Sequence, residues 1–539
     1  MRITKISIDN YKSIQHIEFD PRPGINTFLG ENNVGKSNVF DAINWLIWYT
    51  YPTFNSVTNL HHRKWDPGNK IDIQITYDDG RCLAFSENWI DSFGNEKSWL
   101  HLDDSSVNSA RREHYCSASL WIDRKIQHYL PSNKWSLIGR IFRQINNQFE
   151  TEYISDWNSW DMILKTDLLK QKLETVRDDV LFSVGRAHGA SDNWLMDKFL
   201  LTIQQEAASQ LNTSPADFSL DLSLYDPWNF YKTLQLLVKD PNLDMEFQAS
   251  DTGMWVQASI TIAILKAYAE MNLPNKTPIF IDEPELFLHP HAQKNFYNIL
   301  RELSEDKEDE DGNIIPGVQI FYTTHSPNFL RMDRFDEIFV VRKDPDDWTY
   351  ISSSPMRTFS THDRDKVRHL YENTWDSQKT NEAFFAKKII LVEWQTESLL
   401  LPYFFDLIWY DYVKDWVSIV RCGNKENIHK FFKIYGEFSI PCFIVFDWDK
   451  NHIGTVNEKG TQNLNKQITS LCVSSPIERP DGIPKERYLW FEEEIGKTLW
   501  FSTTKKGLKL FKEVKDHINT PSDLPVWVHQ LIDKLQDFS

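Results

Sequence analysis

Three features of the chain predict an α/β fold with several domains. A glycine-rich loop at residues 30–37, Gly-Glu-Asn-Asn-Val-Gly-Lys-Ser, follows a strand-like run at 24–29 and precedes a helix-like run at 38–47. An apolar run ends in an acidic pair at 282–283, and a later one ends in Asp-x-Asp at 447–449. Strands that alternate with helices are typical of α/β domains. At roughly 150 residues per domain, the chain of 539 residues has room for about two to four of them.

The composition fits a cytoplasmic protein that does not enter membranes. The formal net charge of −18 argues against non-specific nucleic-acid binding over the whole surface, but not against a local basic groove. The five cysteines form no C-x-x-C pair, which fits a reduced compartment and argues against a zinc site or a disulfide framework. The N-terminus lacks the apolar core of a signal peptide, and no run of about 20 apolar residues is present.

The first hundred residues predict strands on both sides of the glycine-rich loop. Residues 3–8 and 14–19 alternate apolar and polar side chains, as strands do. Residues 71–77 and 81–85 predict a hairpin that turns at residues 78–80.

The pattern changes beyond residue 100. Apolar residues spaced by three and four at 167–181 and 194–211 predict a mostly helical insertion over 101–215, which packs on its own domain or forms an intersubunit contact. A polar, Asp- and Thr-rich stretch between about 355 and 385 predicts a domain boundary. The expected organisation is a first domain in two parts, 1–100 and 216–355, interrupted by the insertion and followed by a second domain at 385–539.

The loop at residues 30–37 has the complete pattern G-x-x-x-x-G-K-[ST] of a phosphate loop. Glycines let the backbone wrap around phosphates, so that its amide groups and the N-terminus of the next helix face the anion. In this pattern Lys36 reaches the terminal phosphates and Ser37 ligates Mg²⁺. The alternative is a structural glycine turn. The residues expected to bind nucleotide here are Gly30, Asn32, Asn33, Val34, Gly35, Lys36, Ser37 and Asn38.

Two later strands end in residues that ATP hydrolysis requires. Asp282 follows an apolar strand and is suited to hold the Mg²⁺ shell, while Glu283 is suited to polarise the attacking water. The alternative is an acidic strand end that caps a helix. His325 ends the next strand, at 319–324, where we favour a contact with the γ-phosphate over a structural role.

The order of these motifs resembles a known family. The phosphate loop, then Asp-Glu-Pro-Glu-Leu-Phe-Leu-His-Pro at 282–290, then Thr-Thr-His-Ser-Pro at 323–327 is similar to the ABC-type ATPase heads of the SMC and RecF group, in particular the OLD (overcoming lysogenization defect) ATPases. The resemblance implies a signature motif, assigned to Thr252 and Gly253, that closes on the nucleotide of a partner subunit. It also implies that Lys12 reaches toward the nucleotide, although an exposed lysine in a turn is an equal alternative.

The C-terminal part carries a second set of carboxylates. Within residues 382–397 a strand runs straight into Glu393, and a helix then starts at a second acid, Glu397. A further apolar strand leads into Asp447 and Asp449, whose side chains point the same way if the chain is extended. Carboxylates in this arrangement suit Mg²⁺ or Mn²⁺, and Glu393, Asp447 and Asp449 could hold the two ions of a phosphodiesterase centre.

This second set resembles a Toprim domain, a Rossmann-like α/β domain whose hallmark is a strand-end Glu followed by Asp-x-Asp. An OLD-type ATPase followed by a Toprim is the architecture of the OLD nucleases, which the Gabija A subunit and some retron-associated effectors share. The family also uses a late acidic cluster and a lysine, for which residues 492–494, Lys505 and Lys506 are candidates; a charged helix surface is the alternative. One departure is Trp394, where the family has glycine in a tight turn, and this could weaken catalysis.

Together these observations predict an ABC-type ATPase head with a helical insertion, followed by a Toprim domain. The expected function is that of an ATP-regulated, metal-dependent DNA endonuclease of anti-phage defence, with ATP and Mg²⁺, or Mn²⁺ at the Toprim site, as cofactors. The expected catalytic residues are Glu283, His325, Glu393, Asp447, Asp449, Lys505 and Lys506. The expected metal ligands are Ser37, Asp282, Glu393, Glu397, Asp447 and Asp449.

The resemblance also implies partners. These are DNA and at least a second copy of the chain, with a larger assembly left open, and a defence-system partner that is a helicase, a reverse transcriptase with its RNA–DNA, or a small protein. One alternative function is an ATP-dependent sensor or scaffold with a degenerate Toprim that controls a partner effector. A primase or topoisomerase is disfavoured, since no zinc-binding template domain and no candidate tyrosine nucleophile is present.

Overall fold

The computed structural model places the chain in two compact units, residues 1–122 with 275–539, and residues 123–274. It describes residues 2–47, 59–90, 96–103, 105–107, 118–120, 153–155, 162–165, 167–168, 171–172, 237–240, 245–270, 278–308, 312, 314–354, 368, 371, 377–449, 458–472, 487–491, 495–499, 501 and 506–537. None of the helices in these ranges is long and apolar enough to cross a membrane.

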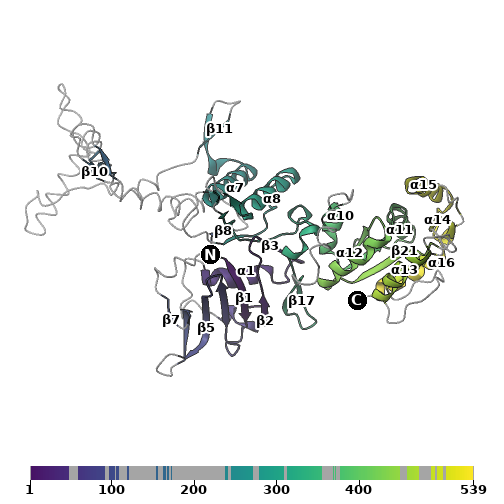
Figure 1. Ribbon diagram of the computed structural model, residues 1–539, viewed down its shortest axis with the longest axis horizontal. Coiled ribbons are helices and arrows are strands. Elements are labelled where there is room, and N and C mark those ends of the chain that lie inside the picture. Colours follow the sequence, from purple (N-terminus) through teal and green to yellow (C-terminus); the bar gives the residue numbers. More distant parts are fainter. Residues whose placement is uncertain are drawn as a thin grey trace, which may run out of the picture. The chain divides into compact units, whose positions relative to one another are not determined.

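The first unit begins with an antiparallel sheet, drawn in purple in Figure 1. Its strand order is β2 (His16–Phe19), β1 (Ile3–Asp9), β4 (Asp72–Tyr77), β5 (Cys82–Ile90), β6 (Glu96–Leu102) and β7 (Ser105–Ser106). The strands predicted at 3–8 and 14–19 and the hairpin at 71–85 are therefore confirmed.

A second, mostly parallel sheet carries the phosphate loop. Its order is β18 (Thr349–Ser353), β17 (Ile338–Lys343), β3 (Ile25–Leu29), β16 (Ile320–Thr323), β13 (Ile279–Ile281) and β8 (Ala118–Leu120), and only β18 runs antiparallel. Since β3, β16 and β13 are parallel neighbours, their carboxyl ends meet at one edge of the sheet. The helix α8 (Pro290–Ser304) follows the acidic strand.

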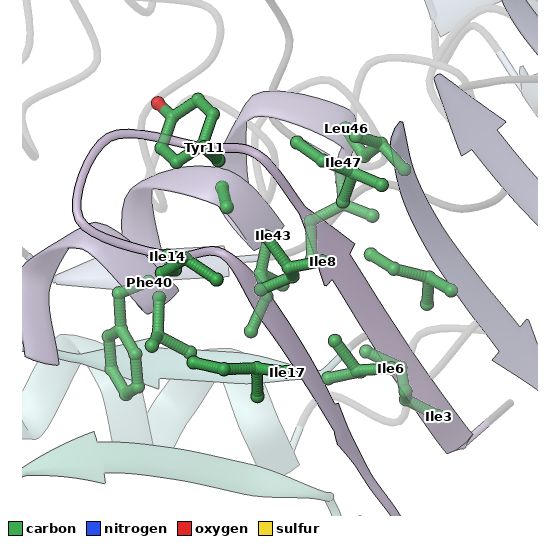
Figure 2. Packing of buried hydrophobic residues seen from close by; sticks show 14 of the residues in the cluster. Ile3, Ile6, Ile8, Tyr11, Ile14, Ile17, Phe40, Ile43, Leu46 and Ile47 are labelled. Carbon is green, nitrogen blue, oxygen red and sulfur yellow. The ribbon is translucent and has the colours of Figure 1, made fainter. Parts of the chain in front are cut away.

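Helix α1 (Lys36–Ile47) packs between these two sheets. On one side Ile43 lies beside Ile8 of β1, as Figure 2 shows, and Leu46 belongs to the same buried cluster. On the other side the Phe40 ring contacts Phe28 and Phe280 of the parallel sheet, at centroid distances of 5.3 and 5.6 Å. Eight of the twelve residues of the helix are buried, so the helix that begins at the phosphate loop is fixed from both faces.

The C-terminal part of the first unit is a parallel four-stranded sheet covered by helices on both faces. Its order is β20 (Val417–Arg421), β19 (Lys388–Val392), β21 (Cys442–Asp447) and β22 (Tyr488–Phe491). Alternate residues face opposite cores: Ile389 and Leu391 pack under α12 (Lys425–Glu437) and α13 (Glu458–Cys472), while Ile390 and Val392 pack under α11 (Gln395–Leu407), α15 (Leu508–His517) and α16 (Val526–Asp537). The described residues of this part also form the α-helices α10 (Ser377–Glu382) and α14 (Ile495–Thr498).

The second unit is described in part. It contains the short pairs β9 (Tyr153–Ser155) with β10 (Met162–Leu164) and β11 (Leu237–Asp240) with β12 (Met245–Gln248), followed by α7 (Met254–Glu270). The predicted helix at 194–211 and most of that at 167–181 lie outside the described residues. The helical insertion and the predicted domain limits therefore stay predictions.

Candidate functional site

The phosphate loop adopts a conformation that requires its two glycines. Gly30 and Gly35 have φ angles of +156° and +102°. A Cβ atom on Gly30 would collide with the carbonyl of Val341, and one on Gly35 with the hydroxyl of Thr349. The positive φ of Gly35 is in any case unfavourable for a residue with a side chain.

A small hydroxyl network holds the loop from outside. Thr349 of β18 donates to the carbonyl of Val34 at 2.8 Å, and its hydroxyl lies 2.7 Å from that of Ser13. The side-chain amide of Asn38 donates to the Ser13 hydroxyl at 2.7 Å. The sequence did not identify Thr349, which comes from a strand more than three hundred residues away. Lys12 pairs with Asp41 at 2.8 Å, and its approach to a nucleotide stays a prediction.

The Lys36 ammonium lies inside the loop. It donates to the backbone carbonyls of Gly30 and Glu31 at 2.9 and 2.8 Å. Burial lowers the pKa of Lys36 to about 8, against the opposing charges of Glu283 and Asp282. Ser37 is exposed at the start of α1. The lysine therefore occupies the concave side of the loop, where the pattern expects phosphate oxygens.

Asp282 and Glu283 are held by one threonine on the neighbouring strand. Thr323, at the end of β16, donates its hydroxyl to the Asp282 carboxylate and accepts the backbone N–H of Glu283 at 3.0 Å. Burial raises the pKa of Asp282. Glu283 has a φ of +47°, an uncommon angle for a residue with a side chain. Thr323 therefore fixes both acids of the pair, a role that the sequence reasoning did not assign.

His325 faces the same acids. Its Nε2 lies 3.7 Å from an oxygen of Glu283, and burial together with the charge of Lys36 lowers the pKa of the imidazole. Glu285 accepts the backbone N–H of His325 at 2.6 Å and the hydroxyl of Thr324 at 2.8 Å. The structure thus brings Lys36, Asp282, Glu283 and His325 to one sheet edge, as their strand-end positions suggest.

Glu393 and Asp447 form the core of the second centre. They lie at the carboxyl ends of β19 and β21, which are parallel neighbours. The backbone N–H of Asp447 donates to Glu393 at 3.4 Å, and both side chains are buried. Burial raises the pKa of Glu393 to about 7 and that of Asp447 well above its ordinary value. Two buried carboxylates at neighbouring strand ends are costly unless a cation or a proton compensates them.

Asp449 departs from the arrangement that the sequence suggested. Strand β21 ends at Asp447, and Asp449 has a φ of +60°, so the extended chain assumed for the Asp-x-Asp motif is wrong at this residue. Its carboxylate instead accepts from Lys425, the first residue of α12. The Lys425 side chain is only 6% exposed. Lys425 is a member of this centre that the sequence reasoning did not assign.

Trp394 is compatible with the local backbone. Its φ and ψ of −122° and 176° are extended, a conformation that does not require glycine. The backbone N–H of Trp394 donates to the Glu397 carboxylate at 2.9 Å, which fixes Glu397 in the first turn of α11. Trp394 also lines a cavity of about 230 Å³ with Glu397, Asp447 and Lys506. Trp394 therefore borders the cavity beside the carboxylates, and the turn does not need glycine.

The roles expected for several other residues stay predictions. Lys505 and residues 492–494 lie outside the described ranges. Thr252 and Gly253 belong to the second unit, where Thr252 accepts from Gln257 through its backbone carbonyl at 2.7 Å and the α7 helix begins directly after Gly253. Their approach to a nucleotide stays a prediction.

The donor set at the second centre fits a divalent cation. In the described part of the chain, one buried oxygen of Asp447 has no hydrogen-bond partner, and Glu393 and Glu397 both act on the Asp447 carboxyl as negative charges. Glu393, Glu397 and Asp447 would supply the hard oxygen ligands that Mg²⁺ and Mn²⁺ prefer. As they stand in this structure, however, no three His, Cys, Asp or Glu side chains among the described residues form a group that could hold a metal ion.

A phosphate-loop ATPase joined to a Toprim sheet defines an enzyme that combines ATPase and nuclease domains. The family model for the AAA ATPase domain matches residues 1–114 and 95–330, and the model for the TOPRIM domain of overcoming lysogenization defect-like proteins matches residues 384–449. The chain belongs to the AAA ATPase domain family and, with its second domain, to the OLD family of nucleases.

Curated relatives agree with this assignment. The OLD nuclease of Thermus scotoductus is 23% identical over 489 residues, which cover 86% of this chain and 85% of the relative. The Old nuclease of Escherichia phage P2 is 24% identical, with 83% and 77% covered. The endonuclease GajA of Bacillus cereus is 25% identical over 202 residues, 34% of this chain and 29% of the relative.

Replacing Thr323 tests how the ATPase acids are held. Thr323→Val removes the hydroxyl that positions Asp282 and Glu283, so we expect ATP turnover to fall about 10–100-fold, as for other groups that orient metal ligands. Nucleotide affinity without Mg²⁺ should stay unchanged, because Lys36 and the loop are intact. Steady-state ATPase assays and nucleotide titrations measure both. Thr323→Ser keeps the hydroxyl and is the matched control; wild-type turnover in Thr323→Val would refute the assignment.

The raised pKa of Glu393 predicts a pH-dependent stability effect in metal-free protein. The folded chain ionises Glu393 near pH 7, against an ordinary value of 4.5, so the folded state loses stability as pH rises between these values. Glu393→Gln removes this cost. In EDTA, we expect its gain in Tm over wild type to grow from pH 5 to pH 8. Asp406→Asn, on an exposed position of α11, should show no such growth, and an equal gain for Glu393→Gln at both pH values would contradict the prediction.

Proposed function

We propose that the chain is an ATP-regulated, metal-dependent DNA endonuclease that acts in anti-phage defence. The observation that carries this proposal is the buried pair Glu393 and Asp447 at adjacent strand ends, with an unpartnered carboxylate oxygen among the described residues. A bound Mg²⁺ or Mn²⁺ would polarise the scissile phosphate and activate water. The chain's own part is to hold the ligands: Glu393 and Asp447 by the sheet, and Glu397 by its bond from the N–H of Trp394.

The residues of the ATPase centre are suited to hydrolyse ATP. Asp282 is suited to the Mg²⁺ shell, with Ser37 from the phosphate loop, and Glu283 to the attacking water. His325, 3.7 Å from Glu283, would sense the γ-phosphate. Thr252 and Gly253 would act on the nucleotide of a second copy, so the active form is at least a dimer.

ATP regulation is supported by direct contacts between the phosphate loop and the Toprim sheet. Glu31 of the loop pairs with Lys387 at 3.3 Å, and Lys387 directly precedes β19, whose far end carries Glu393. Arg342 of β17 donates to the carbonyl of Ser439 at 2.7 Å. Leu29, at the end of β3, lies in the same hydrophobic cluster as Ile389 and Leu391 of β19. A change in the loop on nucleotide binding would therefore reach the strand that positions the nuclease carboxylates.

DNA as the substrate is supported by the names of the relatives, which are nucleases, and by the fit of a divalent cation to the carboxylates. Lys506 lies on the wall of the cavity beside Asp447, where it is suited to neutralise charge on the scissile phosphate. Lys505 is the second candidate for this role. The helicase, the reverse transcriptase with its RNA–DNA, and the small protein remain the candidate defence partners.

Plasmid cleavage tests the nuclease. Wild type with Mg²⁺ or Mn²⁺ should nick or linearise supercoiled plasmid, and Glu393→Ala and Asp447→Ala should abolish cutting because each removes a ligand oxygen from the ion. Asp406→Ala, an exposed acid on α11, should cut like wild type. A chain that never cuts, under any metal or nucleotide condition and with any candidate partner, would instead be the ATP-dependent scaffold.

Nucleotide binding and turnover can be separated in the ATPase centre. Lys36→Ala should abolish nucleotide binding, since it removes the cation inside the loop. Glu283→Ala should bind ATP but not hydrolyse it, because the loop remains and only the group facing the water is lost. Equilibrium binding and phosphate release report the two steps. If both variants hydrolyse ATP normally, these roles are wrong.

A further inference from the structure

The loop between α11 and β20, residues 408–416, presents large apolar side chains to water, and we call it the aromatic loop. Trp409 is 91% exposed, Val413 67% and Trp416 49%. Since β20 begins directly after it, the loop lies at the amino ends of the parallel Toprim strands, at the edge opposite to the carboxylates. Large apolar side chains that gather on one exposed segment mark interaction sites, whereas single ones need no explanation.

The backbone of Trp409 has a conformation that usually belongs to glycine. Its N–H donates to the carbonyl of Asp406 at 3.2 Å, and the N–H of Tyr410 donates to that of Phe405 at 2.9 Å. These two bonds close α11 as a Schellman motif, in which the left-handed residue is most often glycine. Trp409 takes this place with a φ of +59°, and Trp416 has a φ of +55°. Bulky side chains at such angles are outliers, and strained residues of this kind gather at functional sites.

The aromatic loop is held from inside by its tyrosines. The rings of Tyr410 and Tyr412 pack against Phe405 of the buried core, at centroid distances of 5.2 and 5.7 Å. The N–H of Val417, at the start of β20, donates to the carbonyl of Tyr412 at 2.9 Å. The tryptophans are therefore presented on a fixed backbone, which lowers the entropy that binding costs.

The charges around the tryptophans select the kind of partner. The exposed charged side chains of the loop and of the preceding helix turn are Asp406, Asp411, Lys414 and Asp415. The neighbouring Lys387 is paired with Glu31, so it does not offset the carboxylates. Three carboxylates against one ammonium repel the phosphates of a nucleic acid and the same loop of a second copy, but attract Lys and Arg side chains. Tryptophan contributes most to protein–protein binding when it fills a desolvated pocket at the centre of an interface.

We propose that the aromatic loop is the docking site for a partner protein of different sequence, which receives Trp409 in an apolar pocket ringed by Lys and Arg. Val413 and Trp416 cover the margin of that pocket, and the carboxylates of the loop pair with its basic rim. The docking site lies at the other edge of the sheet from the carboxylate centre, so this inference goes beyond the nuclease function and does not rest on it.

Site-specific photo-crosslinking identifies the occupant. The full-length chain would carry p-benzoylphenylalanine in place of Trp409 in its host cell, before and during phage infection. We expect adducts with one polypeptide other than this chain, whose crosslinked peptide contains apolar residues flanked by Lys or Arg. The control carries the same group in place of Val526, which is 72% exposed on α16. Adducts with nucleic acid or with a second copy, or none beyond the control, would overturn the proposal.

Reconstitution with the purified crosslinked protein measures the contribution of the tryptophan. Trp409→Gly should weaken binding about 30-fold or more, the scale of a central tryptophan in an interface. Its Tm should not fall, because glycine suits a φ of +59° better than tryptophan does. Asp411→Lys combined with Asp415→Lys should also weaken binding, and more strongly at low salt. Val526→Gly is the control for binding.

The contradicting outcomes differ from those of the nuclease experiment. Unchanged affinity in Trp409→Gly would overturn the docking site, and a lower Tm would show that Trp409 serves the fold instead. A lower mass of the free Trp409→Gly chain in light scattering would identify a second copy as the occupant and overturn the proposal as well. Absence of cutting in wild type would overturn the nuclease alone, since Trp409→Gly should cut plasmid like wild type.

Discussion

Both centres depend on one constraint: carboxylates must be kept at strand ends that are largely closed to water. In the ATPase half, Asp282 follows β13, and in the Toprim half Glu393 and Asp447 end β19 and β21. Parallel strands direct their carboxyl ends to one edge, so acids from distant parts of the sequence meet there. Burial then favours their neutral forms, and nearby cations and hydrogen-bond donors have to oppose it. Lys36 and Thr323 do this in one half and Lys425 in the other.

The sequence predicted the parts of this arrangement that depend on strand ends. The phosphate loop, the acidic pair Asp282 and Glu283, and His325 each follow an apolar run, so each could be placed at the end of a strand. The parallel order of these strands then brings them to one edge of the sheet. The phosphate loop depends least on distant residues, because its sequence pattern already contains the glycines that its positive φ angles require.

What the sequence did not predict depends on partners far along the chain. Asp449 is not extended, and its carboxylate pairs with Lys425. No pattern around residue 449 indicates this pairing, because Lys425 lies on another element. A sequence feature could have pointed to Lys425, because this residue begins the helix that follows β20, and β20 is the neighbour of β19 in the sheet. Thr349 had none, because a threonine on an edge strand is ordinary until that strand is seen to lie against the loop.

The contact between Glu31 and Lys387 also sets a mechanical relation between the two centres. Both side chains are about half exposed, so the ion pair itself contributes little to stability. Its position matters more, because Lys387 and Glu393 flank the short strand β19 and lie roughly 20 Å apart at about 3.3 Å per residue. That strand is hydrogen-bonded on both sides, to β20 and β21, and cannot bend independently of them. A displacement of Lys387 would therefore be carried along β19 towards Glu393, within a single chain.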